Sequence, residues 1–400
     1  MVGMDAAANR RPGPLVAPLP ELSAAAAARA RRQIVMAGFG EEAQRRLAAA
    51  SVLVIGAGGL GCASVPYLAG AGIGRIGILD DDVVELSNLH RQVEHRTEDL
   101  GRFKADSLAD AVARLDPGIT VDRLITRLTA ENAREIFAGY DLVIDGSDNF
   151  PTRYLANDAA QLVGIPLVWG AILERSGQVS VAWHEYGPGY RDLFPVPPQA
   201  GAVLNCAEAG VLPGLCGTIG SLLATEVLKL ITGVGDPLIG RVLLYDALQA
   251  RTRELELRRD PNAEPITELV DYEILCGIEP SAAGAEAAAE GSAGLAVLTG
   301  EELAERAAAG LAPRLLDVRS APEREERRIA GSEWLDVDRI EAGENPDPDP
   351  AGRPLVIYCE RDPRSIRAAR ALAGRGFAGV GYLRGGIDRL ARTAPELVER

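Results

Sequence analysis

Three things are scarce in this 400-residue chain: cysteine pairs, positive charge and long apolar runs. The five cysteines are scattered without a C-x-x-C pair, so they indicate neither a disulfide framework nor a paired-cysteine zinc site and favour reduced thiols. Acidic residues outnumber basic ones by 57 to 42, and this balance argues against a nucleic-acid or anionic-membrane partner. Because no stretch approaches the roughly 20 apolar residues of a membrane span and the N-terminus lacks a secretory pattern, we expect a cytoplasmic protein.

Length and composition predict two domains. Residues 1–25 are rich in Ala and Pro and predict a disordered arm, and the small residues of 280–294 predict a flexible linker. They flank a first domain over residues 26–279 and precede a second over residues 295–400. In both, short apolar strands alternate with helical periods. This alternation predicts an α/β fold, with a Rossmann-like, mostly parallel sheet in the first domain and a smaller α/β second domain.

A glycine-rich segment follows a strand predicted over residues 52–55 and opens a helix; its glycines are Gly56, Gly58, Gly59 and Gly61. Asp80 ends the next predicted strand, about 20 residues further on. Glycines let a backbone approach phosphates at a helix N-terminus, and a carboxylate at that spacing can accept bonds from ribose hydroxyls. A tight structural turn is the alternative. The pattern by itself fits NAD and ATP equally.

Charged residues beyond this loop favour ATP. Lys104 begins the apolar stripe of a helix predicted over residues 102–115, where an ammonium group needs an anionic partner. Asp148 follows a strand predicted over residues 142–145, at the edge where open parallel sheets bind ligands. We expect Asp148 to hold Mg²⁺ against a triphosphate while Arg91 and Lys104 neutralise phosphate oxygens. Any one of these residues alone could equally belong to a surface ion pair.

With these motifs the chain resembles the ThiF and MoeB adenylyltransferases, relatives of ubiquitin-activating enzymes, from about residue 32 to residue 278. The resemblance implies that the glycines bind phosphates and Asp80 binds ribose. It also implies a set of nucleotide-binding residues beyond the loop, namely Asp82, Asn88, Arg91, Lys104 and Asp148, the last as the Mg²⁺ ligand. Arg32 is similar to the arginine that family dimers insert into the partner subunit's site, which implies a homodimer.

The chain departs from this family at the positions of its structural zinc. Many members carry two C-x-x-C pairs, whereas residues 189–192 and 263–266 of this chain contain no thiol. Because a structural zinc site needs four closed ligands, we predict no zinc. In lacking these thiols, and in Cys276 and the residues before it, the chain resembles the MoeZ-type fusion enzymes of actinobacteria.

Cys206 follows a Gly- and Pro-rich run over residues 187–201 that is too long for an ordinary connection. A buried small hydrophobe is the usual role of an isolated cysteine. The resemblance instead implies the crossover-loop cysteine of the family, which is thought to form a persulfide or thioester link to the carrier. The remaining cysteines of the first domain, Cys62, Cys216 and Cys276, are expected to be structural.

Cys359 follows an apolar strand predicted over residues 355–358 and precedes a helix from about residue 364, where the helix dipole and inward-facing amides favour a thiolate. The surrounding residues, about 295–397, resemble a single rhodanese domain. A cysteine phosphatase is the rival interpretation. Its loop requires Arg six positions after the cysteine, where this chain has Ser365.

Three residues of the Cys359 loop depart from the usual pattern. Glu360 and Asp362 add negative charge, and Pro363 removes one N–H group. We therefore expect Cys359 to accept sulfur from a protein persulfide faster than from thiosulfate.

Together these resemblances imply that ATP and Mg²⁺ activate the C-terminal Gly-Gly carboxylate of a small ubiquitin-like sulfur-carrier protein, and that a Cys359 persulfide converts it to a thiocarboxylate, directly or through Cys206. Molybdopterin, cysteine, thiamin and natural-product pathways all remain open. An NAD-dependent dehydrogenase would share the glycine loop but would not require Arg91, Lys104 and Asp148. A docking protein without catalytic activity is the second alternative.

Overall fold

In a computed structural model the chain forms two compact units, Met1–Glu279 and Pro280–Arg400, and each is described here by itself. The structure describes residues 12–197, 210–263, 265–272, 295–349, 352–360, 363–377 and 379–399. The predicted linker over 280–294 lies outside the described residues, as do Cys206, Cys276 and Asp362.

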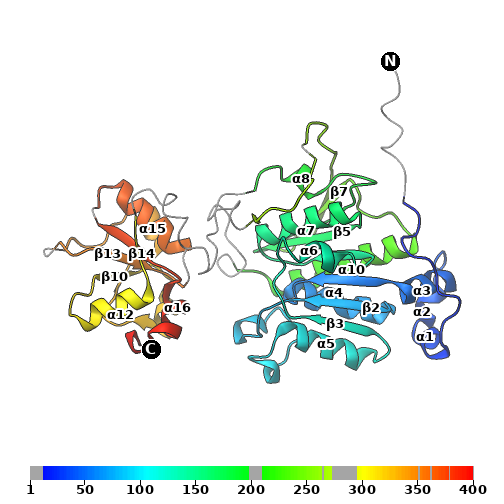
Figure 1. Ribbon diagram of the computed structural model, residues 1–400, viewed down its shortest axis with the longest axis horizontal. Helices are drawn as coiled ribbons and strands as arrows, with labels where there is room; N and C mark the ends of the chain where they lie inside the picture. Colours follow the sequence, from blue (N-terminus) through cyan, green and yellow to red (C-terminus); the bar gives the residue numbers. More distant parts are fainter. Residues whose placement is uncertain are drawn as a thin grey trace, which may run out of the picture. The chain divides into compact units, whose positions relative to one another are not determined.

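An eight-stranded sheet forms the centre of the first unit, in the order β3-β2-β1-β4-β5-β6-β7-β8 (Figure 1). Its strands are β1 (Ser51–Ile55), β2 (Arg75–Leu79), β3 (Thr120–Leu124), β4 (Leu142–Asp145), β5 (Leu167–Leu173), β6 (Ser176–Ala182), β7 (Arg241–Asp246) and β8 (Arg251–Glu256). In the sheet order, neighbouring strands pair in parallel from β3 through β2, β1 and β4 to β5. Neighbouring strands from β5 through β6 and β7 to β8 pair antiparallel. The predicted mostly parallel sheet is therefore confirmed, with an antiparallel extension at one side.

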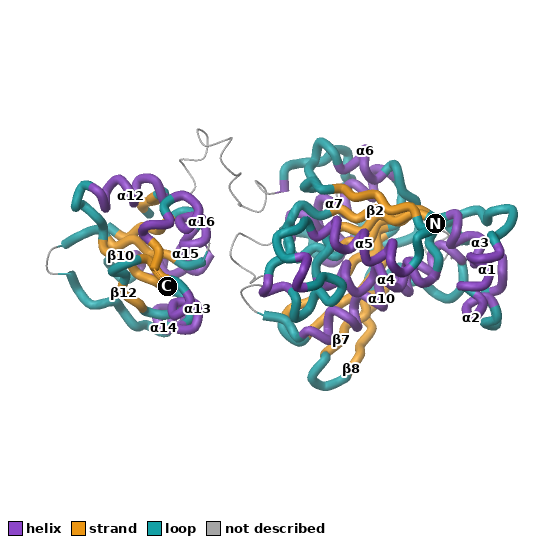
Figure 2. Tube along the Cα trace, turned by 90° about the horizontal axis from the view of Figure 1, so that it is seen from below, coloured by secondary structure: helices purple, strands orange, loops and turns teal. Residues whose placement is uncertain are grey.

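Helices cover both faces of this sheet, and α4 and α10 lie beside each other on one of them (Figure 2). The helical segments are α1 (Ala24–Arg29), α2 (Arg31–Ile34), α3 (Gly40–Ala49), α4 (Gly59–Ala71), η1 (Leu86–Asn88), η2 (Thr97–Asp99), α5 (Lys104–Leu115), α6 (Ala133–Phe137), α7 (Phe150–Val163), α8 (Tyr190–Leu193) and α10 (Pro213–Thr232). Val52 and Val54 of β1 pack with α4, α5 and α10. Leu53 and Ile55, which point to the opposite face, pack with α6 and α7. Both faces of the parallel strands are therefore buried, which explains their continuous apolar sequences.

Residues 12–25 are ordered against the first unit, so the predicted disordered arm over 1–25 is wrong for this part. The Leu15 N–H donates to the Leu230 carbonyl of α10 at 3.0 Å, and Arg45 of α3 donates to the carbonyls of Leu19 and Pro20. Leu15 and Val16 pack against the apolar cluster beneath α10. The amino-acid composition gave a wrong prediction for this segment because backbone hydrogen bonds hold much of it in place. Such bonds leave no periodic pattern in the sequence. Residues 1–11 lie outside the described residues.

By length and composition alone, α10 could cross a membrane, and 56% of its most apolar window is buried inside the unit. Leu215, Ile219 and Leu223 are fully buried against α4 and the sheet. The apolar character of α10 is thus that of a core helix.

A five-stranded parallel sheet forms the second unit, in the order β12-β10-β13-β14-β9, with a two-stranded pair of β11 and β15. Its strands are β9 (Ala296–Leu298), β10 (Arg314–Asp317), β11 (Arg328–Ile329), β12 (Glu333–Trp334), β13 (Leu355–Tyr358), β14 (Val380–Leu383) and β15 (Val398–Glu399). Its helical segments are α12 (Gly300–Ala308), α13 (Ala321–Glu326), α14 (Val337–Glu341), α15 (Pro363–Gly374), α16 (Gly386–Thr393) and η3 (Pro395–Leu397). One apolar cluster joins the sheet to α14 and α15, and a second joins it to α12 and α16.

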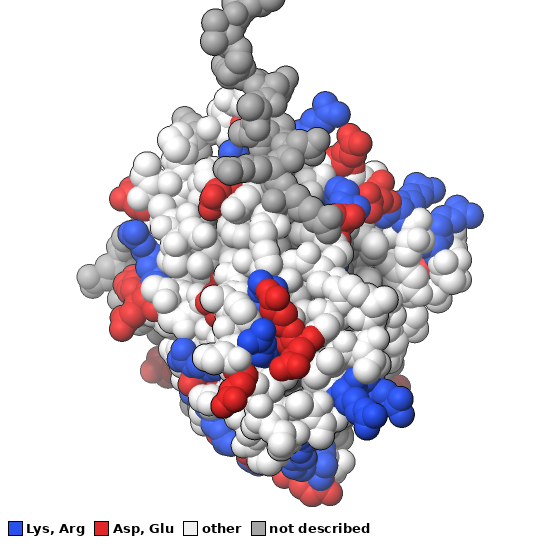
Figure 3. Space-filling view, turned by 90° about the vertical axis from the view of Figure 1, so that its right-hand side faces the viewer, with Lys and Arg blue, Asp and Glu red and all other residues white. Residues whose placement is uncertain are grey.

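The surface charges are mixed on the face that Figure 3 shows. Lys and Arg side chains stand beside Asp and Glu side chains, around a broad area of other residues. Although the formal net charge of the chain is −15, the acidic groups of this face therefore do not form one continuous patch.

Candidate functional sites

The glycine loop joins β1 to α4 and passes very close to other backbone. Gly56 adopts a φ of +89°, in the region that favours glycine. A Cβ atom on Gly61 would lie 2.0 Å from the Gly56 carbonyl oxygen, and one on Gly59 would lie 2.7 Å from the Cys216 sulfur. The N-cap of α4, Gly58, offers no side-chain hydrogen bond to the first turn. The N-terminal N–H groups of this helix therefore lack a side-chain cap at a place where only glycine fits, as a phosphate site requires.

Asp80 connects the end of β2 to the glycine loop. Its Oδ2 accepts the Ala57 N–H at 2.7 Å, and its Oδ1 accepts the Asp82 N–H at 2.8 Å. Burial raises the pKa of Asp80, and the nearby Lys104 ammonium opposes part of that rise. The carboxylate that we expect at the ribose thus also fixes the backbone of the loop.

Lys104 is the first residue of α5 and is buried, with 8% of its surface exposed. Its Nζ donates to Asp82 Oδ2 at 2.7 Å. Leu108 and Val112 continue the buried face, whereas Leu115 is 44% exposed. The anionic partner that the buried lysine required is therefore Asp82, which remains largely exposed.

The turn after η1 lies beside the glycine loop. Asn88 is buried and its Oδ1 accepts the Glu85 N–H at 3.2 Å. The Arg91 side chain donates to the Ser87 carbonyl at 3.2 Å, and its Cγ would lie 3.8 Å from a Cβ atom on Gly59. The second contact places Arg91 at the glycine loop, and the first fixes Asn88 within its own 3-10 turn.

Gln92 is a candidate that the sequence did not single out. It is 3% exposed, and its Oε1 lacks a hydrogen-bond partner among the described residues. Its Nε2 would lie 3.6 Å from a Cβ atom on Gly58. The only sequence signal was its place directly after Arg91.

A series of buried hydrogen bonds ends at the backbone of the glycine loop. Its residues were also not predicted from the sequence. His95 Nε2 lies 2.9 Å from the Ala57 carbonyl, and its Nδ1 lies 2.9 Å from Ser107 Oγ. Ser107 Oγ donates to Asp99 Oδ2 at 2.8 Å. Burial lowers the pKa of His95 and raises that of the neighbouring Cys62 thiol. Cys62 is thereby kept as a protonated thiol, which agrees with the structural role expected for it.

Asp148 lies in the turn between β4 and α7 and is exposed. This turn touches the glycine loop, because a Cβ atom on Gly56 would lie 3.2 Å from the Gly146 carbonyl oxygen. Asp145 ends β4, is buried, and accepts the Ser147 N–H at 2.9 Å; burial raises its pKa. The structure therefore brings the predicted Mg²⁺ ligand to the same end of the sheet as the glycines.

A cavity of about 600 Å³ begins at Asp148 and extends across β5 to β8. Other residues that line it include Phe150, Arg153, Tyr190, Phe194, Tyr245 and Arg253. Arg153 is buried and donates to the Ser147 carbonyl at 3.1 Å. The cavity is lined by aromatic side chains together with Arg153, Arg251 and Arg253, so it offers both apolar and cationic contacts to a ligand.

Arg32 stands on α2 and is exposed. The neighbouring Gln33 donates to Gln44 at 2.7 Å, which anchors α2 to α3. The arginine is thus carried on an anchored helix with its side chain directed to the surface.

Arg191, in the first of the two segments that lack the zinc thiolates, forms an ion pair. Arg191 donates two hydrogen bonds to Asp158 of α7, at 2.9 and 2.7 Å, and a third to the Tyr272 hydroxyl. Its guanidinium also lies over the rings of Tyr154 and Tyr272, 5.5 and 5.3 Å from their centroids. These contacts connect α8 to α7 and to the end of the first unit.

Cys359 lies directly after β13 and is 1% exposed. Its Sγ is 3.6 Å from Ser365 Oγ, and its carbonyl accepts the Ile387 N–H at the start of α16. The sulfur is therefore held at the carboxyl end of a parallel sheet, at a fixed position relative to α15 and α16.

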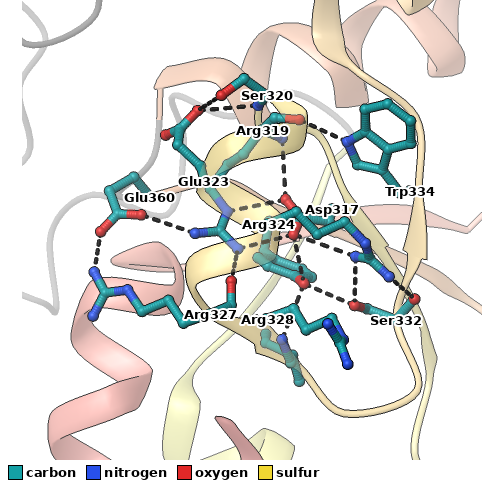
Figure 4. A network of polar contacts seen from close by, with 12 residues as sticks. Asp317, Arg319, Ser320, Glu323, Arg324, Arg327, Arg328, Ser332, Trp334 and Glu360 are labelled. Atoms are coloured by element: carbon teal, nitrogen blue, oxygen red, sulfur yellow. Dashed lines mark hydrogen bonds and ion pairs between the residues drawn. The ribbon is translucent and has the colours of Figure 1, made fainter. Parts of the chain in front are cut away.

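Glu360, the next residue, is part of the ion-pair network of Figure 4. Arg319 donates to Glu360 at 3.0 Å and makes two further bonds to Asp317, and Arg327 pairs with the other Glu360 oxygen. The negative charge that we expected Glu360 to add is therefore paired with two guanidinium groups. Asp362 lies outside the described residues.

The residues present fit ATP. The glycine loop leaves no room for a Cβ atom on Gly59 or Gly61, and the buried Gln92 Oε1 lacks a partner among the described residues. The Lys104 ammonium and the Arg91 side chain add positive charge beside the loop. This combination is that expected of an enzyme that binds a nucleotide, and the second unit presents a buried cysteine at the carboxyl end of a parallel sheet, as expected of a sulfurtransferase.

The comparisons with known proteins agree with that class. The chain belongs to the ThiF family, whose model matches residues 30–266, and a rhodanese-like domain matches residues 299–393. A probable adenylyltransferase/sulfurtransferase MoeZ of Mycobacterium tuberculosis is 44% identical over 390 residues, 96% of this chain and 98% of the relative. A sulfur carrier protein adenylyltransferase of Thermus thermophilus is 53% identical over 258 residues, 62% of this chain and 95% of the relative.

Solved structures share the fold of the first unit. PaaA has a TM-score of 0.52 at 24% identity, over 60% of this chain and 76% of that chain. Escherichia coli MccB has a TM-score of 0.51 at 18% identity, over 57% and 67%. The chain is an adenylyltransferase and sulfurtransferase that uses ATP, and neither the dehydrogenase nor the docking-protein alternative is supported.

Proposed function

We propose that the first unit uses ATP and Mg²⁺ to adenylate the C-terminal Gly-Gly carboxylate of a small ubiquitin-like sulfur-carrier protein. The observation that carries the proposal is the contact between two turns, the glycine loop after β1 and the turn of Asp148 after β4. In support of the proposal, this contact brings the glycine loop, the Asp148 carboxylate and the cavity over β5 to β8 to one end of the sheet. The name of the Thermus thermophilus relative gives the substrate class.

The charged residues at the nucleotide site divide several tasks of this reaction among them. The carrier carboxylate attacks the α-phosphorus of ATP, and pyrophosphate leaves with the electron pair of the broken P–O bond. Arg91 and Lys104 neutralise the phosphate oxygens on which charge develops, and Asp82 holds Lys104 in place. Asp148 would hold Mg²⁺, and the ion would supply positive charge against the triphosphate oxygens. Asp80 accepts bonds from the ribose.

The cavity over β5 to β8 is where we place the carrier's extended tail. It begins at Asp148, so a tail lying in it would end at the nucleotide. Two glycines at the end of the tail present no side chain, so the tail would need little width where it meets the nucleotide.

Sulfur transfer follows from the adenylate. A Cys359 persulfide attacks the carbonyl carbon, AMP leaves with its electron pair, and an acyl disulfide joins carrier and enzyme. A thiol, either Cys206 or an external one, then attacks the Cys359 sulfur, and the carrier thiocarboxylate departs. The resulting disulfide at Cys359 is reduced by a second thiol. A linker over residues 280–294 would let the two units meet for these steps.

We further propose a homodimer completed by Arg32 in the partner site. In its support, Arg32 is exposed beside a surface hollow of about 380 Å³ whose lining residues are all uncharged. The sulfur donor, a protein persulfide or thiosulfate, and the cytoplasmic location are likewise proposals; the five scattered cysteines, which include no C-x-x-C pair, fit a reducing compartment. We propose that no zinc is bound, since residues 189–192 and 263–266 contain no thiol and a structural zinc site needs four closed ligands.

Carrier-dependent exchange of labelled pyrophosphate into ATP tests the adenylation step. We expect Asp148→Ala to abolish exchange with small ubiquitin-like proteins that end in Gly-Gly while the protein stays folded. Glu135→Ala, which removes an exposed carboxylate from α6, is the matched control and should leave exchange intact. Wild-type exchange that persists in Asp148→Ala would remove the adenylation proposal.

A further inference from the structure

Ala57, the second residue of the glycine loop, has both of its backbone groups bound by side chains. Its N–H donates to Asp80 Oδ2 at 2.7 Å, and its carbonyl accepts from His95 Nε2 at 2.9 Å. The Cys62 thiol, a weak donor, lies 3.4 Å from the same carbonyl. His95 lies between η1 and η2 and is 5% exposed. This histidine has no part in the reaction described above, yet it holds the loop at its centre.

The carbonyl that His95 holds determines where the next N–H group, that of Gly58, points. The peptide bond between residues 57 and 58 is trans. In a trans peptide the C=O bond and the following N–H bond lie in one plane and point in opposite directions. Because His95 draws the Ala57 carbonyl toward the buried side, the Gly58 N–H is turned to the other side of the loop. This N–H makes no hydrogen bond to any described residue, so it is left for a ligand.

The contact with Ala57 also determines which ring nitrogen of His95 carries a proton. A carbonyl can only accept, so the hydrogen bond requires a proton on Nε2. Nδ1 lies 2.9 Å from Ser107 Oγ, and a hydroxyl can act as donor or acceptor. Burial lowers the pKa of His95 and the Lys104 ammonium acts in the same direction, against the Ala57 bond and the Asp99 carboxylate. The ring is therefore neutral near about pH 7, with its one proton on Nε2.

Further polar residues fix the orientation of the His95 ring. Ser107 of α5 is 1% exposed and lies 2.8 Å from Asp99 Oδ2, which also accepts the Arg96 N–H at 3.1 Å. Asp99 in turn pairs with Arg102. Polar groups are costly to bury, and an apolar side chain would fill the same space without this series of hydrogen bonds. The series therefore indicates a task at the loop beyond packing.

We propose that His95 is a positioning residue for ATP: by donating from Nε2 to the Ala57 carbonyl, it turns the Gly58 N–H toward a phosphate of the nucleotide. His95 itself does not touch ATP. Because the N–H group is oriented before the nucleotide arrives, binding does not have to reorient the loop. The inference rests on the proposed adenylation function and adds to it a residue that acts through the backbone.

The test compares ATP with adenosine, which has no phosphate, by calorimetry on the full-length protein. His95→Leu fills the space of the ring but cannot donate. His95→Gln keeps a side-chain N–H that can reach the Ala57 carbonyl. Val112→Ala is the matched control, because it removes a side chain of α5 that is 1% exposed and leaves every hydrogen bond of this series in place.

We expect His95→Leu to bind ATP roughly tenfold more weakly, as the loss of one hydrogen bond to a charged group predicts, and to bind adenosine as wild type does. His95→Gln should recover most of the ATP affinity. Val112→Ala should lower the Tm and leave the ratio of the two affinities unchanged. A wild-type ratio in His95→Leu, an equal loss of both ligands, or no recovery in His95→Gln would overturn the inference, because each outcome describes a residue that only fills space.

A second measurement keeps the test decisive if His95→Leu fails to fold. The chain has three histidines, so the ring nitrogens of ¹⁵N-histidine-labelled wild type can be assigned by NMR with His90→Gln and His184→Gln. A neutral His95 with its proton on Nε2 supports the inference, and a proton on Nδ1 overturns it. Neither measurement needs a carrier. Wild type that binds ATP but shows no carrier-dependent pyrophosphate exchange would instead refute the proposed adenylation.

Discussion

Replacing Arg191 by Met should destabilise the first unit strongly. Asp158 is fully buried, and the substitution would leave its carboxylate with one described side-chain donor, Asn157 Nδ2 at 2.9 Å. Breaking a buried pair from one side costs about 3–5 kcal/mol. Because the Arg191 side chain is 31% exposed, we expect the lower end, about 3 kcal/mol. For a unit of this size that corresponds to a fall in Tm of roughly 6–12 °C.

The loss should depend on pH in a defined direction. Burial raises the pKa of Asp158 even when Arg191 is present, and removing the guanidinium would raise it further. A carboxyl group whose pKa is higher in the folded state stabilises the fold below its unfolded pKa, and that stabilisation is lost as the pH rises through the folded pKa. The difference between Arg191→Met and wild type should therefore be largest near about pH 8 and smaller near about pH 5.

Thermal and urea unfolding at both pH values would measure the effect. Arg258→Met is the control, since Arg258 and Glu256 are 87% and 80% exposed and such a pair is worth about 0–1 kcal/mol. A zinc chelator should leave wild-type unfolding unchanged. Equal midpoints for the two variants, or a wild-type midpoint that falls with the chelator, would refute the view that this ion pair takes the place of a metal.

Further predictions concern the nucleotide site. Lys104→Ala and Arg91→Ala should each lower carrier-dependent pyrophosphate exchange by about two orders of magnitude or more, because each removes a preorganised charge; losses below tenfold would contradict their assignment. Gly61→Ala should abolish ATP binding in calorimetry, since its Cβ would lie 2.0 Å from the Gly56 oxygen. Gly70→Ala, in the same helix with nothing within 4 Å, should bind ATP normally, and equal affinities would show that the close approach at residue 61 is dispensable.

The sequence by itself determined the local elements and their chemistry. A strand was predicted over residues 52–55 and observed at Ser51–Ile55, and the predicted strand over 142–145 was observed at those residues. The need of Lys104 for an anionic partner followed from its place on an apolar stripe, and Asp82 fills it. These features were predictable because helical and strand periodicity and the glycine requirement act over a few residues.

Only the tertiary structure decided which distant side chains meet. Arg191 and Asp158 are 33 residues apart, and Arg319 and Glu360 are 41 apart; no local pattern pairs either of them. The same holds for His95 and the Ala57 carbonyl. From the sequence Glu360 counted as a negative charge, and in the fold its charge is matched. The reason is physical: a charge acts through the partners that strand order and helix packing bring to it, and those are set by the whole fold.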